Sequence, residues 1–375
     1  MPEIIFGNGS ISEVGNCCLR LGASNVLIVS DRGISEAGWL DVVIDSCVKA
    51  GLKYETFIDI TVNPKDTEVD KGRNIYLKYG CDSVIGIGGG SAIDAAKAIA
   101  LLATNGGVIH DYEGVDKIKH PLPPQIMIPT TAGSGSEVSQ FSIILNTEKQ
   151  KKMTIISKSL IPDIAIIDPE TLVTKSSHLT ASTGIDVLTH GIESYISLAA
   201  TPLTDVHAKN SISLVAKYLR PSVASKLNKE AKTNMAMASL QAGIAFSNAI
   251  LGAVHAMSHA VGGRYPILHG DVNSILLPHV MEFNYLANPQ KFADIAYLLG
   301  LNDCDISKME AAKKAIDLVK ELIQDVGAPQ RLSEIHVKKE EIPQMSLTAL
   351  HDACMITNPR DVTVEIIEEL FRKAW

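Results

Sequence analysis

A short segment in the C-terminal half of the chain, "GAVHAMSHAVGGRYPILHG" (252–270), contains three histidines, His255, His259 and His269. Only 11 histidines occur in 375 residues, so such a local concentration calls for a chemical reason. His255 and His259 are four residues apart, which places both imidazoles on one face of a helix. His269 follows a bend that contains glycine and proline and can return the chain to the same point. Because imidazole nitrogens bind divalent transition metals, the segment predicts a metal site.

A second segment, "STGIDVLTHGIESYIS", supplies a carboxylate and a fourth imidazole. Asp186 and His190 are four residues apart, hence on one helical face. In so apolar a segment both groups are costly unless each finds a partner. With His255 and His269 they form a set of three nitrogen ligands and one oxygen ligand, which suits Fe²⁺ or Zn²⁺ and leaves a position open for a substrate oxygen. The alternative for any single histidine is an ordinary hydrogen-bonded core residue, and we adopt that interpretation for His178, His207 and His279.

A glycine-rich turn follows a buried strand in the N-terminal half, in "DSVIGIGGGSAIDAAKAIALL" (82–102). Glycines at 88–90 let the backbone approach a phosphate, and a helix beginning at Ala92 would direct N–H groups and a positive dipole end at the anion. The segment therefore predicts a pyrophosphate site, with a tight structural turn as the alternative. The spacing from Gly86 to Ser91 reads GxGxxS, which differs from the standard dinucleotide fingerprint.

Two further turns at strand ends could contact a nucleotide. Asp31 follows "NVLIVS", where a carboxylate could accept hydrogen bonds from an adenosine ribose and repel a 2′-phosphate, favouring NAD over NADP. Capping of the next helix is an equally good interpretation of Asp31. In "PTTAGSGSE" (129–137), the hydroxyls of Thr130 and Thr131 could reach a nucleotide.

The chain that positions these residues changes character near its middle. Short apolar runs at 25–30, 53–59, 82–88, 125–129 and 163–168 alternate with helical patterns. Such alternation predicts a mainly parallel sheet covered by helices. From about Ser177 onward almost every segment has helical length and periodicity, for example 230–249 and 307–327. We therefore expect a fold of the α/β plus all-α type: a Rossmann-like dinucleotide-binding domain over residues 1–176 and an all-helical metal and substrate domain over residues 177–375.

Bulk composition limits the classes of function. The net charge is −8, with no basic surface signature, so nucleic acid is not expected as a partner. No leader-like start and no run of about 18 apolar residues occurs, which predicts a soluble protein without a membrane partner. The six cysteines form no CxxC pair, which indicates buried thiols in a reducing compartment, the cytoplasm. They are Cys17, Cys18, Cys47, Cys81, Cys304 and Cys354.

Longer motifs around these residues resemble a known family, the iron-containing (group III) metal-dependent alcohol dehydrogenases. The resemblance runs essentially end to end, through "FGNGSISEVG", "GGGSAIDAAKAIA", "PTTAGSGSEVS", "DPETL", "GIDVLTHGIESY", "HAMSHAVGG" and "DACMITNPR". It implies a dinucleotide-binding α/β domain, a helical metal domain and an active site in the cleft between them. It also implies a homodimer or higher homo-oligomer.

The resemblance assigns roles residue by residue. Asp186, His190, His255 and His269 correspond to the four metal ligands, and His259 to a histidine near the nicotinamide and the substrate. The implied cofactor contacts are Gly88, Gly89, Ser91 and Asp94 at the pyrophosphate, Thr130 and Thr131 on the nucleotide, Lys152 beside the ribose, Asp31 on the adenosine ribose and Asn63 on the adenine side. The implied cofactors are NAD(H) and Fe²⁺, or Zn²⁺ in its place.

The implied reaction is hydride transfer between nicotinamide and a small primary alcohol or aldehyde whose oxygen the metal polarises. The proton would travel through the ribose hydroxyl, water or His259. One departure from the family concerns Arg264, which follows two glycines where the family usually has an aromatic or aliphatic residue. An arginine there could clamp an anionic aldehyde, such as sulfoacetaldehyde or a semialdehyde, and the alternative is an outward surface ion pair.

Two other classes of function stay open at this stage. A polyol dehydrogenase or a dehydroquinate-synthase-like enzyme would share the fold, but "GIDVLTHGIE" and "HAMSHAVGG" favour the alcohol dehydrogenases. A redox sensor that binds nucleotide and metal without turnover belongs to a different class. The sequence leaves open the aldehyde, the physiological direction and the choice between iron and zinc.

Overall fold

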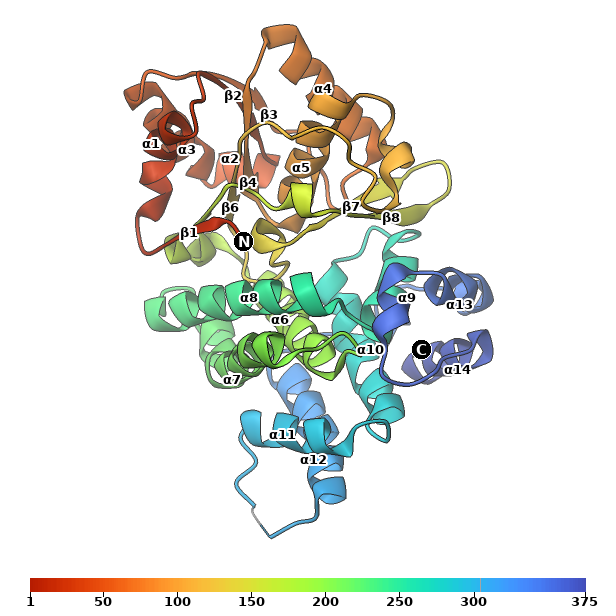
Figure 1. Ribbon diagram of the computed structural model, residues 1–375. Coiled ribbons are helices and arrows are strands. Elements are labelled where there is room, and N and C mark those ends of the chain that lie inside the picture. Colours follow the sequence, from red (N-terminus) through yellow and green to blue (C-terminus); the bar gives the residue numbers. More distant parts are fainter. Residues whose placement is uncertain (304) are drawn as a thin grey trace. The chain divides into compact units, whose positions relative to one another are not determined.

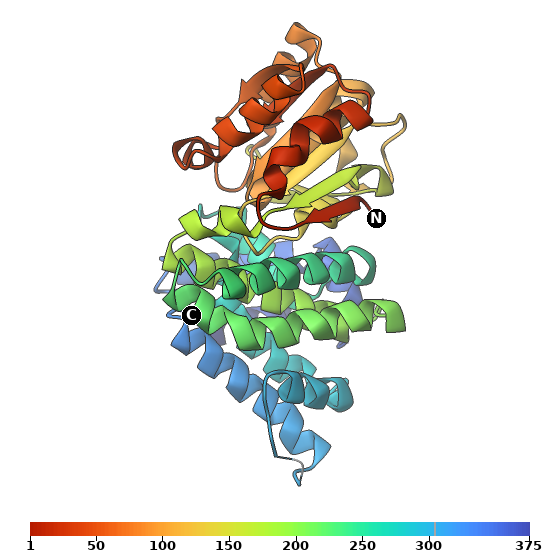
Figure 2. The same cartoon turned by 90° about the vertical axis from the view of Figure 1, so that its left-hand side faces the viewer.

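The computed structural model describes residues 1–303 and 305–375. The described chain divides into two compact units (Figures 1 and 2). The first consists of Met1–Thr131 and Gly135–Thr174, and the second of Ala132–Ser134 and Lys175–Trp375. The sequence predicts a single domain boundary after residue 176. It does not predict that the short segment Ala132–Ser134 groups with the second unit.

A six-stranded, wholly parallel sheet forms the centre of the first unit, in the order β1-β9-β6-β4-β2-β3. Its strands are β1 (Glu3–Phe6), β2 (Asn25–Val29), β3 (Lys53–Phe57), β4 (Ser83–Gly88), β6 (Gln125–Pro129) and β9 (Ile164–Ile167). Every residue of β4, β6 and β9 is buried, as expected for strands covered on both faces. All five strands that the sequence predicts are present, and β1 is an additional edge strand.

Helices cover both faces of this sheet. They are α1 (Val14–Arg20), α2 (Arg32–Glu36), α3 (Trp39–Lys49), α4 (Asp66–Tyr79) and α5 (Gly90–Asn105). Leu27 and Val29 of β2 pack into one core with α4 and α5, whereas Val26 and Ile28 pack into the other with α1 and α3. This alternation follows from the two-residue period of a strand and gives a three-layer sandwich, in which α4 and α5 lie on the opposite side of the sheet from α1 and α3 (Figure 1).

A smaller sheet, which the sequence analysis does not predict, adjoins α5. Its order is β5-β8-β7, with β7 and β8 antiparallel. The strands are β5 (Gly114–Val115), β7 (Phe141–Asn146) and β8 (Lys151–Ile156). Short 3₁₀ helices complete the unit: η1 (Ser10–Glu13), η2 (Ile109–Tyr112), η3 (Ser136–Val138), η4 (Lys158–Leu160) and η5 (Pro169–Thr174).

The second unit contains helices and connecting segments, and no strand among its described residues. Its helices are α6 (Ser177–Ile196), α7 (Pro202–Ala224), α8 (Lys229–Ala249), α9 (Ala253–Gly262), α10 (His269–Asn284), α11 (Pro289–Leu298), α12 (Lys308–Asp325), α13 (Ile342–Leu350) and α14 (Val364–Ala374), with η6 (Lys339–Glu341) and η7 (Ala353–Thr357). Local signals set several ends: the Ser176 side chain caps α6, and Ser307 with Glu310 forms a capping box on α12. Helix α6 packs against α7, α8 and α10.

No single helix in the described chain is long and apolar enough to cross a membrane. Helices α8 and α9 taken together reach the necessary length and apolar composition, but the chain bends by 101° between them. The cysteines are buried and unpaired at Cys17, Cys18, Cys47, Cys81 and Cys354, while Cys304 lies outside the described residues.

Candidate metal centre and nucleotide turn

Helix α6 carries Asp186 and His190 on one buried stripe. It is 20 residues long and begins at a good N-cap, so both residues lie well inside it, away from the frayed ends. Both side chains are almost fully buried. A carboxylate and an imidazole in such a position need partners from neighbouring helices.

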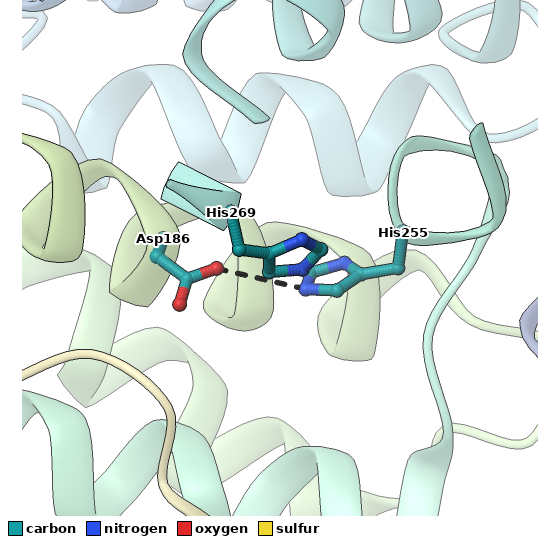
Figure 3. A group of neighbouring side chains, drawn as sticks. All are labelled: Asp186, His255 and His269. Atoms are coloured by element: carbon teal, nitrogen blue, oxygen red, sulfur yellow. Dashed lines mark ion pairs between the residues drawn. The ribbon is translucent and has the colours of Figure 1, made fainter. Parts of the chain in front are cut away.

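Those partners come from α9 and α10. His255 lies in the first turn of α9, and His269 is the first residue of α10. Asp186, His255 and His269 each offer one ligand atom, and these three atoms lie within 4.8 Å of one another. Figure 3 shows the three side chains pointing toward a common point, with Oδ1 of Asp186 and Nε2 of His255 3.8 Å apart. The bend before His269 therefore returns the chain so that this imidazole lies beside His255, as the sequence predicts.

His190 stands beside this triad. Its Nδ1 is 4.0 Å from Oδ1 of Asp186, and its ring stacks on His255 with a centroid distance of 4.5 Å. Phe246 stacks on the same imidazole at 4.6 Å, and the ring also hydrogen-bonds to the backbone of Gly133. The structure thus brings all four predicted ligands together, with three of them closest to one another.

The electrostatics of the cluster fit a cation. Burial lowers the pKa of His190 to about 4. Burial acts in the same direction on His255, but the nearby carboxylates of Asp186 and Glu193 outweigh it and raise the pKa of that imidazole to about 9. Burial acts to raise the pKa of Asp186, yet the surrounding imidazoles bring it below its usual range. A negative carboxylate surrounded by imidazoles attracts positive charge, and a metal ion can take the place of protons there.

Two buried nitrogens support this interpretation directly. Nδ1 of His190 and Nε2 of His255 have no hydrogen-bond partner among the described residues. Buried polar atoms are rarely left so, and each exception asks for an explanation such as an ion. Three imidazoles and one carboxylate form a donor set for Fe²⁺ or Zn²⁺, so the residues present fit a divalent transition metal.

His259 also adjoins the cluster but has a different partner. It is buried, its ring stacks on His269 at 5.3 Å, and its Nδ1 lies 2.9 Å from Oδ2 of Asp352. The imidazole lowers the pKa of Asp352 against the effect of burial, so the carboxylate accepts and Nδ1 donates. This arrangement leaves Nε2 of His259 as the nitrogen that can take up a proton.

In the first unit, β4 leads through the glycine turn into α5. The helix begins at Gly90 and not at Ala92, which corrects the sequence expectation by two residues. Gly88 has φ +153°, and a Cβ there would lie 2.6 Å from the Cβ of Ala92. The N–H of Thr130 donates to the carbonyl of Gly88 at 2.8 Å, so the ends of β4 and β6 are joined at the turn. The glycine is therefore required by the backbone itself.

Asp31 lies at this turn and caps a helix. Its Oδ1 accepts from the N–H of Ile34 at 3.1 Å, at the start of α2. A Cβ placed on Gly88 would lie 3.2 Å from its Oδ2, so the second oxygen points at the glycine turn. Capping and ribose recognition use different oxygens and are compatible, and the ribose contact stays a prediction.

The other predicted nucleotide residues have diverse surroundings. Asp94 is engaged within the protein, where its carboxylate accepts from the Ser136 hydroxyl and from the N–H of Ile143 at 3.1 Å. Oγ1 of Thr130 is buried without a hydrogen-bond partner among the described residues. Of the rest, Ser91 lies in the first turn of α5, Gly89 is its N-cap, Thr131 ends the first segment of the unit, Lys152 lies buried on β8, and Asn63 is buried with φ 55° in the loop before α4.

Comparison with known proteins follows the same division of the chain. Residues 2–169 match the model "Iron-containing alcohol dehydrogenase", and residues 180–375 match "Fe-containing alcohol dehydrogenase family, C-terminal". The chain belongs to the iron-containing alcohol dehydrogenase family. The predictions of this family, of its fold and of an oxidoreductase that acts on CH–OH groups are confirmed.

Several members of the family are similar to this dehydrogenase along its whole length. A 1,3-propanediol dehydrogenase from Klebsiella pneumoniae is 42% identical over 378 residues, which cover 100% of this chain and 98% of that protein. The crystal structure of a 1,3-propanediol oxidoreductase has a TM-score of 0.97 at 42% identity and covers 100% of this chain and 98% of that chain. A sulfoacetaldehyde reductase from Bifidobacterium kashiwanohense, in complex with NAD⁺, has a TM-score of 0.87 at 29% identity and covers 100% and 96%.

In this alcohol dehydrogenase Arg264 is paired with another residue. Its Nη1 lies 3.5 Å from Oε2 of Glu341, and both side chains are partly exposed. The ion pair corresponds to the second interpretation of Arg264. The ion pair is weak because it is long and partly solvated.

Four residues with structural contacts to the two sites escape the sequence analysis. Asn273 donates from Nδ2 to Oδ1 of Asp186 at 2.7 Å, and Asp352 and Glu193 accept from His259 and His255. The fourth, Lys97, is fully buried in α5, where its ammonium donates to the carbonyls of Ser136 (2.6 Å), Ser139 (2.8 Å) and Phe141 (3.0 Å). Glu193 and Lys97 carry a signal in the sequence, because each is a charged residue within a largely apolar helix, but this signal does not identify the partner of either.

Proposed function

We propose that this protein is an NAD(H)-dependent and divalent-metal-dependent alcohol dehydrogenase and aldehyde reductase that acts on small primary alcohols and aldehydes. One observation carries the proposal: a buried carboxylate and three imidazoles converge, and two of the ring nitrogens have no hydrogen-bond partner among the described residues. Membership of the family and the NAD⁺ complex of a similar protein support it.

Asp186, His190, His255 and His269 are the proposed metal ligands. When bound, the cation supplies Lewis acidity that favours the ionised form of an alcohol, and the nicotinamide gives or takes the hydride. Asn273 fixes the Asp186 carboxylate through its hydrogen bond, which keeps one oxygen oriented before any ion arrives. The native ion is Fe²⁺ or Zn²⁺, both of which this donor set accepts.

His259 is the proposed proton carrier. Its Nδ1 donates to Asp352, so a proton leaving an alcohol can be taken up at Nε2 and stabilised by the carboxylate behind the ring. In aldehyde reduction the same atom returns the proton. Water and the ribose hydroxyl are alternative routes for that proton.

The nucleotide is proposed to bind at the turn that follows β4. Gly88, Gly89 and Ser91 would present backbone N–H groups at the start of α5 to the pyrophosphate. Thr130 offers a hydroxyl that has no hydrogen-bond partner within the described chain. Asp31 offers its second oxygen to the adenosine ribose, which favours NAD over NADP. The roles of Thr131, Asp94, Lys152 and Asn63 in holding the nucleotide belong to the same proposal.

For the substrate, the pairing of Arg264 with Glu341 favours a small uncharged alcohol or diol over an anionic aldehyde. Replacement of Arg264 by leucine decides between them. If the arginine clamps an anion, KM for sulfoacetaldehyde rises while KM for propionaldehyde stays the same. Equal changes in both constants mean that Arg264 serves only its ion pair.

The main test of the function is oxidation of NADH by a panel of small aldehydes, with and without a strong chelator. We expect turnover that disappears on chelation and returns when Fe²⁺ or Zn²⁺ is added back. Turnover only with polyols would favour the polyol dehydrogenases. Binding of metal and nucleotide without any turnover would favour a sensor. Cytoplasmic location and a homo-oligomeric state are proposals that accompany this function, and light scattering tests the second.

A further inference from the structure

The helix that carries His255 starts in an unusual way. Helix α9 has Gly252 at its N-cap, which offers no side-chain cap. Its first N–H groups are satisfied from elsewhere: Ala253 donates to Oδ1 of Asn358 at 3.2 Å, and Val254 donates to Oε1 of Glu193 at 2.7 Å. Side chains far away in the sequence therefore replace the local cap that most helices use.

Glu193 does more than cap this helix. Its Oε2 accepts from Nδ1 of His255 at 2.6 Å and also from the backbone N–H of the same residue at 3.3 Å. The carboxylate is 2% exposed. One buried side chain thus binds both the backbone and the ring of a proposed metal ligand.

The position of Glu193 on α6 explains how it reaches this place. Asp186, His190 and Glu193 follow at intervals of four and three residues, which is the spacing of one helical stripe. The stripe that supplies two proposed ligands to the metal therefore supplies the anion behind a third.

Gly252 makes room for this contact. A Cβ at residue 252 would lie 2.8 Å from Oε1 of Glu193 and 3.2 Å from Oδ1 of Asn358. Serine, threonine or asparagine, the usual capping residues, would therefore push the glutamate away. The chain gives up a local cap at α9 and keeps the remote carboxylate.

We propose that Glu193 is a positioning residue for the metal. By accepting at Nδ1, it selects the tautomer of His255 whose Nε2 lone pair faces Asp186, and it fixes the direction of that lone pair through the start of α9. Together with Asp186, it brings two carboxylates to the site, which balance the charge of a divalent cation. The inference rests on the proposed metal-dependent function.

Glu193→Gln tests the proposal, because the amide keeps the shape of the side chain but has only one acceptor oxygen for the three N–H donors. The direct readout is the dissociation constant of Zn²⁺, measured by competition with a chromophoric chelator on metal-free protein. We expect affinity to fall by about tenfold to a hundredfold. Glu193→Asp, which retains the charge, should recover part of that loss.

Asn358→Ala is the matched control. It removes the other remote cap of α9 and should lower stability, but it does not touch the ring of His255. We expect it to change the Zn²⁺ dissociation constant less than about threefold. If it weakens Zn²⁺ binding as much as Glu193→Gln, anchoring of the helix is sufficient and the proposal is wrong.

Failure of this inference can be separated from failure of the function. If the wild-type protein binds no Zn²⁺ or Fe²⁺, the proposed function fails. If the wild type binds Zn²⁺ and Glu193→Gln binds it equally well, only the role of Glu193 fails. Should the glutamine variant not fold, the aspartate variant decides: weaker binding than wild type supports the role, and equal binding overturns it.

Discussion

The two candidate sites consist of different kinds of chemical group. In the helical unit the functional groups are side chains: one carboxylate and three imidazoles converge from α6, α9 and α10. In the α/β unit they are mainly backbone groups, since the turn after β4 consists of glycines whose N–H groups open α5. The first arrangement depends on which residues are present, and the second on the conformation that the residues permit.

The difference also concerns which buried polar atoms at each site have no hydrogen-bond partner among the described residues. The metal cluster leaves two buried nitrogens without a hydrogen-bond partner in the described chain. At the turn one such atom is Oγ1 of Thr130, whereas the N–H of Thr130 donates to Gly88 and the Lys97 ammonium donates to three carbonyls of the neighbouring loop. A ligand should therefore change the stability of the helical unit more than that of the α/β unit.

The largest effect should follow from removal of one proposed metal ligand. His255→Ala removes an imidazole whose Nε2 lies 3.8 Å from Asp186 and should lower kcat/KM on the order of a thousandfold, because the cation contributes several kcal/mol to charge stabilisation. Steady-state kinetics at saturating Zn²⁺ or Fe²⁺ measure this. His207→Ala is the control, since His207 pairs with Gln241 and lies outside the cluster. Unchanged turnover in His255→Ala would refute the metal site.

The spacing of residues in the sequence predicts the proposed metal ligands and His259, but it does not predict which residues hydrogen-bond to them. Asp186 with His190 and His255 with His259 stand four apart, a period that any helix converts into proximity. Glu193 lies 62 residues from His255, and Asp352 lies 93 residues from His259. Such pairs meet only through the packing of whole helices, so no local pattern could reveal them.

The sequence predicts the central strands of the fold, but not the edge strand β1 of the main sheet or the strands of the smaller sheet. The central strands β4 and β6 are continuous apolar runs because helices cover both of their faces. Strands β1, β5, β7 and β8 are missing from the sequence prediction. β1 is only four residues long and half exposed at the sheet edge, and β7 and β8 are joined by "TEKQ", which has no typical hairpin turn signal. Their formation depends on partners elsewhere in the unit.

An ionisable side chain near the glycine turn, Glu137, tests whether the α/β unit also contains a buried charge. Glu137 is buried beside Lys97, and burial raises its pKa to about 7 from 4.5. Between these values the unfolded chain releases its proton while the native protein keeps it, so this group makes the native state less stable as pH rises from 4.5 to 7.

Glu137→Gln removes this pH-dependent loss of stability, because the amide of glutamine does not titrate. Relative to the wild type, the variant should gain on the order of 2 kcal/mol of unfolding free energy between about pH 5 and about pH 7.5. Urea unfolding of both proteins with metal bound measures the difference. If the gap between them does not change with pH, Glu137 is already ionised in the native state, where the neighbouring Lys97 ammonium balances its charge.

A methyl group on Gly88 tests the backbone site itself. Gly88→Ala places a Cβ 2.6 Å from Ala92 at a φ of +153°, so the turn must shift. We expect the dissociation constant of NADH to rise by about tenfold, which corresponds to about 1.4 kcal/mol, with no change in Zn²⁺ affinity. Gly80→Ala is the control, because Gly80 also has a positive φ but lies at the far end of α4. A parallel loss of Zn²⁺ affinity would show that the sites are not independent.

The smallest effect should come from Asp31, where capping and recognition can be separated. Asp31→Asn keeps an oxygen for the N–H of Ile34, so the unfolding free energy should change by less than about 0.5 kcal/mol, whereas Asp31→Ala loses the cap at a cost of about 1 kcal/mol. Both variants lose the negative charge that repels a 2′-phosphate, so the ratio of kcat/KM for NADH to that for NADPH should fall several-fold in each. If the ratio is constant while stability follows the cap, Asp31 is only a capping residue. The cofactor preference then has to come from elsewhere in the turn, where the backbone and not a side chain would set it.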